Sequence, residues 1–169
     1  MFIAASNSDT RKKMKMEKLI KDFKSLSKFI GIISLYHVYN LVSYLVDLSN
    51  VDLSTADAMT QQFMPVVKVI SALLFVLSIL VHLFLCFRGL REANDPSSAK
   101  FHIILAIIWT LGYAFGAIGT GTELFGGANN VLVNVIDLLF NAAMTVLLFF
   151  YSKFAAQVRG LEKEKKNYY

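Results

Sequence analysis

The stretch Val131–Lys153, VLVNVIDLLFNAAMTVLLFFYSK, decides how this chain folds. At a rise of about 1.5 Å per residue, it is long enough as a helix to cross a hydrocarbon core of about 30 Å. At spacings of three, four and four residues it carries polar side chains that share one helix face: Asn134, Asp137, Asn141 and Thr145. A carboxylate inside a spanning helix is too costly to leave facing lipid. We therefore expect this polar stripe to face other helices.

The composition of the whole chain agrees with a membrane protein. Of its 169 residues, 56% are hydrophobic and only 17% are charged, and the mean hydropathy is +0.53. Soluble proteins average about 45–50% apolar and about 25% charged residues, so both values deviate toward the membrane class. Cys86 is the single cysteine, which excludes an intrachain disulfide, a CxxC redox pair and any cysteine-based metal spacing.

Three further apolar segments precede the stretch Val131–Lys153 in the chain. The predicted spans are therefore residues 29–46, 65–87, 101–119 and 131–151. The lysines and arginines outside them number eight, zero, three, zero and five in successive segments from the N-terminus. Cytoplasmic loops carry the excess of basic residues, so both termini and the middle loop are predicted to be cytoplasmic. The pattern predicts an all-α, four-helix, up-down bundle in the cell membrane. Because the basic residues sit at span ends, the net charge of +5 does not indicate a nucleic-acid partner.

The N-terminal segment, residues 1–28, is basic and amphipathic. Its apolar side chains recur at helical spacing among eight lysines and arginines. Such a helix can lie on an anionic inner leaflet before the first span begins. The alternative is a solvated helical extension of that span. At the other end, residues 152–169 are predicted to form a charged, helical cytoplasmic tail behind the membrane domain of residues 29–151.

Polar residues inside the spans fall at comparable depths. Counted from the cytoplasmic edge, His37 and His82 both lie roughly 9–12 Å deep, so we expect them to be neighbours. Deeper polar residues, at roughly 15–21 Å, are Asn40, Tyr113, Asn141, Tyr44 and Asp137. We expect Asp137 to face the bundle interior and to contact the first span near Tyr44 or Asn40. Either these groups join the helices by hydrogen bonds, or they form a path for protons or cations.

Small residues in the third span predict a close helix contact. Gly112 and Gly116 are four residues apart, and Thr120 continues the spacing. This pattern allows two helix backbones to approach, so we expect a neighbouring helix, either the fourth span or a helix of another protomer, to pack against the two glycines.

No motif for catalysis, cofactor binding or metal binding emerges from the sequence, and nothing selects a nucleophile and a base among the serines and histidines. We therefore expect a protein that is not an enzyme and has no cofactor. The favoured function is that of a subunit or regulator of a larger membrane assembly, in contact with lipid and with other membrane chains or copies of itself. The alternative is a small proton- or cation-coupled transporter or oligomeric pore that uses the buried polar stripe.

Overall fold

The computed structural model describes residues 2–49, 58–95, 100–126 and 131–166. These residues form four helices: α1 (Phe2–Ser49), α2 (Ala58–Asn94), α3 (Phe101–Phe125) and α4 (Val131–Lys166). Each helix contains an 18-residue window with a mean hydropathy between 1.5 and 2.8, and each is long and apolar enough to cross a membrane. The predicted all-α membrane fold with four spanning helices is thereby confirmed.

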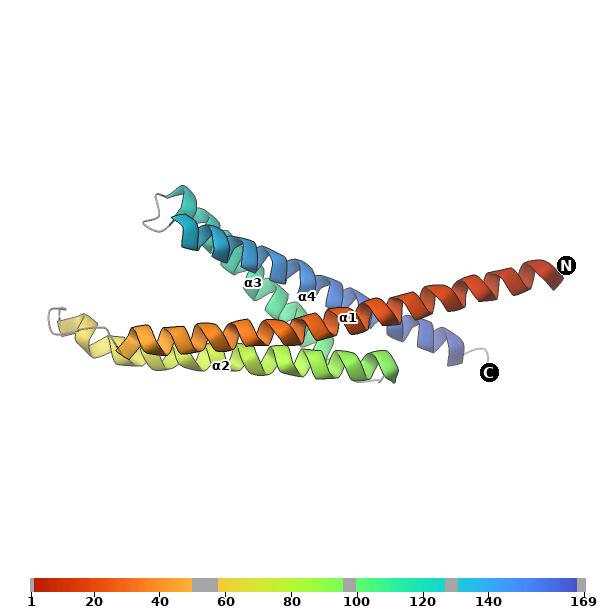
Figure 1. Ribbon diagram of the computed structural model, residues 1–169, viewed down its shortest axis with the longest axis horizontal. Coiled ribbons are helices and arrows are strands. Elements are labelled where there is room, and N and C mark those ends of the chain that lie inside the picture. The colour runs from red at the N-terminus through yellow and green to blue at the C-terminus, as the bar shows by residue number, and fades with distance from the viewer. Residues whose placement is uncertain (1, 50–57, 96–99, 127–130, 167–169) are drawn as a thin grey trace.

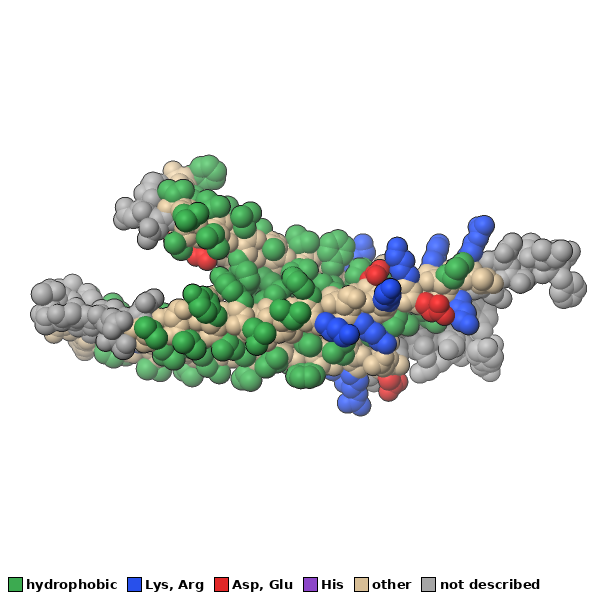
Figure 2. All heavy atoms as spheres, in the orientation of Figure 1, with side chains coloured by type: hydrophobic (Ala, Val, Ile, Leu, Met, Phe, Trp, Pro, Cys, Tyr) green, Lys and Arg blue, Asp and Glu red, His purple; other side chains and the backbone are tan. Residues whose placement is uncertain are grey.

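The four helices are arranged as two antiparallel hairpins (Figure 1). The first hairpin consists of α1 and α2, and the second consists of α3 and α4; most contacts between helices occur within a hairpin. The hairpins cross near the middle of α1 and diverge away from the chain termini, so that on that side of the crossing they form a V. We call the end where lysines and arginines gather in Figure 2 the basic end, and the other the open end.

The basic N-terminal segment continues directly into the first span. α1 is one helix of 48 residues, and its side chains Phe23, Ser27 and Ile30 have no solvent exposure. Partly buried neighbours on the same face, Leu19, Ile20 and Leu26, pack against the hydrophobic core. The predicted turn between this segment and the first span is therefore wrong, because α1 is one continuous helix. The structure has the alternative, a helical extension, with one face packed against the other helices and its lysines largely exposed.

The hydrophobic core lies at the crossing of the hairpins. Its largest fully buried apolar side chains come from three helices: Phe23, Ile30, Leu85, Met144, Leu148 and Tyr151. Farther toward the open end, the apolar side chains mostly face outward, and only 11% to 22% of the residues in the most apolar window of each helix are buried. Such helices need an apolar solvent, and a lipid bilayer provides one.

Two glycines allow α1 and α2 to approach closely inside this core. A Cβ atom added to Gly31 would lie 2.6 Å from the Sγ atom of Cys86, and one added to Gly89 would lie 2.8 Å from the ring of Tyr151. It would also overlap the hydroxyl of Ser27. These positions have room only for hydrogen, so small residues set the interhelical distance here.

Candidate functional site

Two histidines and a tyrosine meet where the hairpins begin to diverge. His37 of α1 and His82 of α2 have ring centroids 4.7 Å apart, as their similar predicted depths suggested. Tyr113 of α3 places its hydroxyl 2.8 Å from Nε2 of His37 and 3.2 Å from Nε2 of His82. The phenol of the second hairpin thus joins both histidines of the first. We call these three residues the His–Tyr–His cluster.

The imidazole of His82 is also held from its other side. Its Nδ1 atom lies 2.6 Å from the backbone carbonyl oxygen of Ser78, one helical turn earlier in α2. A carbonyl oxygen accepts hydrogen bonds and cannot donate them, so Nδ1 of His82 carries a proton. His82 has no solvent exposure and His37 has 6%, so the bonds within the cluster replace bonds that water would otherwise provide.

The fourth helix completes the cluster with an aromatic ring. Phe140 of α4 lies edge-on to His37 at 5.7 Å and to Tyr113 at 6.1 Å between ring centroids. It also packs on Tyr36 of α1, with ring centroids 4.5 Å apart. All four helices therefore meet at this level, and an apolar ring shields the hydrogen bonds.

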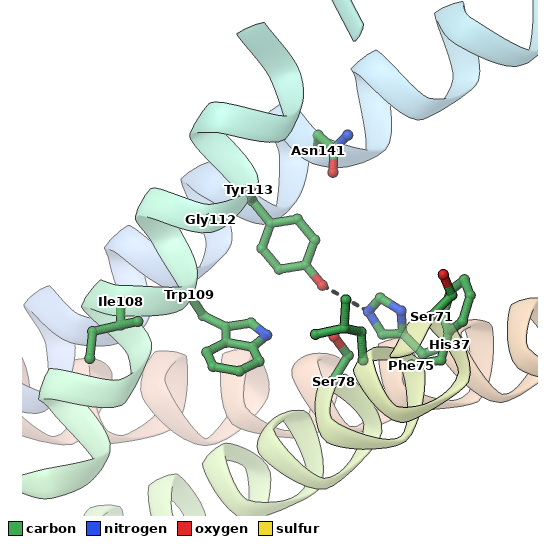
Figure 3. A pocket seen from close by; sticks show the side chains of 10 residues that line it. His37, Ser71, Phe75, Ser78, Ile108, Trp109, Gly112, Tyr113 and Asn141 are labelled. Atoms are coloured by element: carbon green, nitrogen blue, oxygen red, sulfur yellow. Dashed lines mark hydrogen bonds between the residues drawn. The ribbon is translucent and has the colours of Figure 1, made fainter. Parts of the chain in front are cut away.

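A cavity of about 630 Å³ opens beside the cluster, between α2 and α3 (Figure 3). We call it the cleft. Polar side chains on its wall are those of His37, Ser71, Ser78, Tyr113 and Asn141. The remaining wall is apolar or aromatic, with Leu74, Phe75, Ile108 and Trp109, and the backbone of Gly112. Ser71, Ser78 and Trp109 could not be assigned from sequence, because no periodic pattern marks them as facing one another.

The predicted depths did not place Tyr113 beside the histidines. Its position along the third span placed it near the midplane with Asn40 and Asn141, whereas the structure joins it to the histidines. The hairpins are inclined to one another (Figure 1), so equal distances along two helices do not correspond to equal depths. The length of the tyrosine side chain also helps its hydroxyl to reach the two histidines.

The two glycines of the third span have different surroundings. A Cβ atom on Gly116 would lie 3.3 Å from the side chain of Asn141, so α3 and α4 are close at this point. A Cβ atom on Gly112 would meet nothing within 4 Å, because Gly112 lines the cleft. The predicted neighbour, the fourth span or another protomer, is therefore found within this chain only at Gly116, since the inclination of the hairpins leaves open space beside Gly112.

The polar stripe of α4 lies partly on the cleft and partly beyond it. Asn141 faces the cleft, while the hydroxyl of Thr145 donates to the backbone carbonyl of Asn141 at 2.8 Å. Asn134 and Asp137 are half-buried.

The predicted contacts of Asp137 with the first span are not among the hydrogen bonds of the described residues. The packing of Phe140 on His37 places Asp137, one turn earlier in antiparallel α4, at the level of Asn40. α1 and α4 diverge toward the open end, however (Figure 1), and Tyr44 packs instead on Phe75, with ring centroids 5.6 Å apart.

A buried ion pair at the basic end was not predicted. Glu92 of α2 has no solvent exposure and forms a salt bridge with Arg159 of α4. His102 of α3 is 1% exposed and stacks edge-on against Tyr151, and both of its ring nitrogens lack a hydrogen-bond partner among the described residues. The hydroxyl of Tyr151 donates to the carbonyl of Leu85 at 2.8 Å.

One feature of the sequence indicates burial at the basic end. Leu85, Gly89 and Glu92 follow one another at spacings of four and three, so the inner face of α2 continues past the predicted end of the span at residue 87. Glu92 and Arg159 lie outside the predicted spans, and a charged residue there gives no indication of burial.

The geometry determines which chemistry the described residues can support. They contain no group of three or more histidine, cysteine, aspartate or glutamate side chains placed to hold a metal ion. The Nε2 atoms of both histidines are hydrogen-bonded to the hydroxyl of Tyr113, and an arrangement of this kind can bind and pass a proton.

No protein-family model, curated protein or solved structure matches this chain. The class of the protein therefore rests on its own fold: four apolar helices compatible with a membrane-embedded, multi-pass protein.

Proposed function

We propose that this chain is a non-enzymatic subunit or regulator of a larger membrane assembly, and that its cleft receives a transmembrane helix of a partner chain. The observation that carries the proposal is the cleft itself, an open space between the apolar helices of the two hairpins whose wall includes polar side chains. The wall of polar side chains needs a partner that can hydrogen-bond, and acyl chains cannot do so.

A helix fits this space for two physical reasons. Between helices in lipid, association depends on close van der Waals packing and on interhelical hydrogen bonds, because the acyl chains are as apolar as leucine. The cleft offers both kinds of contact: the open backbone at Gly112 permits close approach, and the amide of Asn141 can donate and accept hydrogen bonds. The occupant is thus a spanning helix with a polar side chain near its middle.

The proposal includes that this chain is not an enzyme. In the cleft, the groups most suited to acid–base chemistry are His37 and Tyr113, and they are hydrogen-bonded to one another. No serine, threonine or cysteine side chain is hydrogen-bonded to a histidine or carboxylate among the described residues that line the cleft, and the segments that connect the four helices are short.

A pair of photo-crosslinking positions tests the proposal. Leu74 and Leu73 are adjacent in α2 and are 59% and 62% exposed, but only Leu74 lines the cleft. A photoreactive amino acid at position 74 should crosslink in native membranes to one discrete partner, and the same group at position 73 should not. Mass spectrometry of the crosslinked peptide should place the attachment inside a spanning segment of that partner.

Other outcomes have defined meanings. A crosslinked dimer of this chain would identify a second copy as the occupant and would still agree with an assembly role. Crosslinks from position 74 to lipid alone, at the same yield as from position 73, would contradict the proposal.

Proton or cation transport is the second candidate, and the His–Tyr–His cluster favours it. A purified homo-oligomer in liposomes that dissipates a proton gradient would support this function. The same preparation with Tyr113→Phe should then lose the activity, because the hydroxyl that joins the two imidazoles is gone.

A further inference from the structure

We infer that the His–Tyr–His cluster is a binding site for a single proton, which enters from the cleft and passes from His37 to His82 through the hydroxyl of Tyr113. The inference concerns this chain by itself and holds with or without a partner in the cleft. It rests on the directions that the hydrogen bonds must have.

The carbonyl oxygen of Ser78 fixes these directions. It can only accept, so neutral His82 carries its proton on Nδ1 and leaves Nε2 bare as an acceptor. The hydroxyl of Tyr113 must then donate to Nε2 of His82. Tyr113 has no second proton, so Nε2 of His37 must donate to the tyrosine oxygen. Two adjacent histidines are thereby held in opposite tautomers.

One added proton can be accommodated without loss of any of these hydrogen bonds. It binds to Nδ1 of His37, whose side chain lines the cleft. The proton on Nε2 of His37 can then move to the tyrosine oxygen while the tyrosine proton moves to Nε2 of His82. His37 ends neutral with its proton on Nδ1, Tyr113 ends neutral with its hydroxyl turned toward His37, and His82 carries the positive charge.

A second proton is opposed by the first. It would place two imidazolium rings with centroids 4.7 Å apart in an apolar surrounding, where like charges interact strongly. The groups that face the cluster offer no compensation at contact distance. α3 contributes Tyr113 and α4 contributes the ring of Phe140, while the carboxylate of Asp137 lies one turn nearer the open end. The pair should therefore titrate in two separated steps.

The test uses the full-length chain labelled with 15N-histidine in phosphatidylcholine–phosphatidylglycerol nanodiscs. The chain has three histidines, so His102→Gln leaves only the signals of the pair. At high pH, long-range 1H–15N spectra should show His82 with its proton on Nδ1 and His37 with its proton on Nε2. On acidification, the pair should take up one proton in a first step and a second only in a distinct later step.

Tyr113→Phe provides the matched comparison. His37 should lose its fixed tautomer and give signals of both forms, whereas His82 should keep its proton on Nδ1, because the carbonyl of Ser78 is still present. Unaltered tautomers and titration in Tyr113→Phe would overturn the inference. So would either of two results in the parent chain: His82 with its neutral proton on Nε2, or both histidines protonated in a single step.

Discussion

Glu92 and Arg159 show how much a single pair of side chains contributes to this fold. The carboxylate side chain is fully buried and the arginine side chain is 10% exposed, so solvent screens their attraction little. The pair connects α2 of the first hairpin to α4 of the second. Removing one partner of such a pair leaves an uncompensated charge in the interior, which costs more than the pair contributes.

Replacing Arg159 with methionine should therefore lower the free energy of unfolding by about 3–5 kcal/mol. The double variant Glu92→Met with Arg159→Met should recover most of that loss, because no charge remains buried. The free energies of unfolding of the single and the double variant can be measured in detergent, by circular dichroism at increasing denaturant concentrations. Gln157→Met, at an exposed position of the same helix, is the control and should change little. Equal losses in the single and double variants would contradict this account.

At the scale of helices, close approach is concentrated at the basic end. Gly89 of α2 faces Ser27 of α1 and Tyr151 of α4, and neither neighbour can move easily. The hydroxyl of Ser27 donates to the carbonyl of Phe23 at 2.8 Å, and Tyr151 is fixed by its bond to Leu85. Gly112 of α3, in contrast, adjoins open space.

These surroundings predict that alanine is tolerated at Gly112 but not at Gly89. Gly89→Ala should destabilise the protein by about 1–3 kcal/mol, the usual cost of excess volume in a packed core. Gly112→Ala should be neutral or stabilising, because alanine favours the helix and has room. Melting temperatures of the two variants in the same detergent give the comparison. A larger loss for Gly112→Ala would mean that the spacing of Gly112 and Gly116 marks the main helix contact after all.

The whole molecule is joined across its two hairpins by a short series of polar links. They include the bonds of Tyr113 to the histidines, the bond of Tyr151 to Leu85, and the ion pair of Arg159 with Glu92. All lie between the apex of the cleft and the basic end. These links lie on the side of the molecule where the hairpins cross, so they help to hold the angle between the hairpins.

The orientation of this V in the membrane is predicted by its basic residues. Both termini should be cytoplasmic, since cytoplasmic segments retain the lysines and arginines. Single cysteines introduced at Ser6, Ala128 and Asn167, in a chain carrying Cys86→Ala, allow a test in intact cells. A membrane-impermeant maleimide should label position 128 alone until the cells are permeabilised. Labelling of either terminal position in intact cells would reverse or refute the predicted topology.

The sequence by itself determined the number of helices that can span a membrane and their approximate extent. These properties follow from local quantities, the length of an apolar run and the cost of burying charge, so they need no knowledge of neighbours. The proximity of His37 and His82 was also accessible, because residues at similar depths in adjacent antiparallel helices of one hairpin lie opposite each other.

Only the tertiary structure decided which groups of different hairpins meet. Tyr113 joins the histidines, Glu92 is buried beside Arg159, and Gly112 faces open space rather than a helix. In lipid, burial of apolar surface does not choose among helix faces, because lipid and leucine are equally apolar. The choice depends on side-chain shape and on individual hydrogen bonds at the crossing, which hydrophobic patterning does not encode.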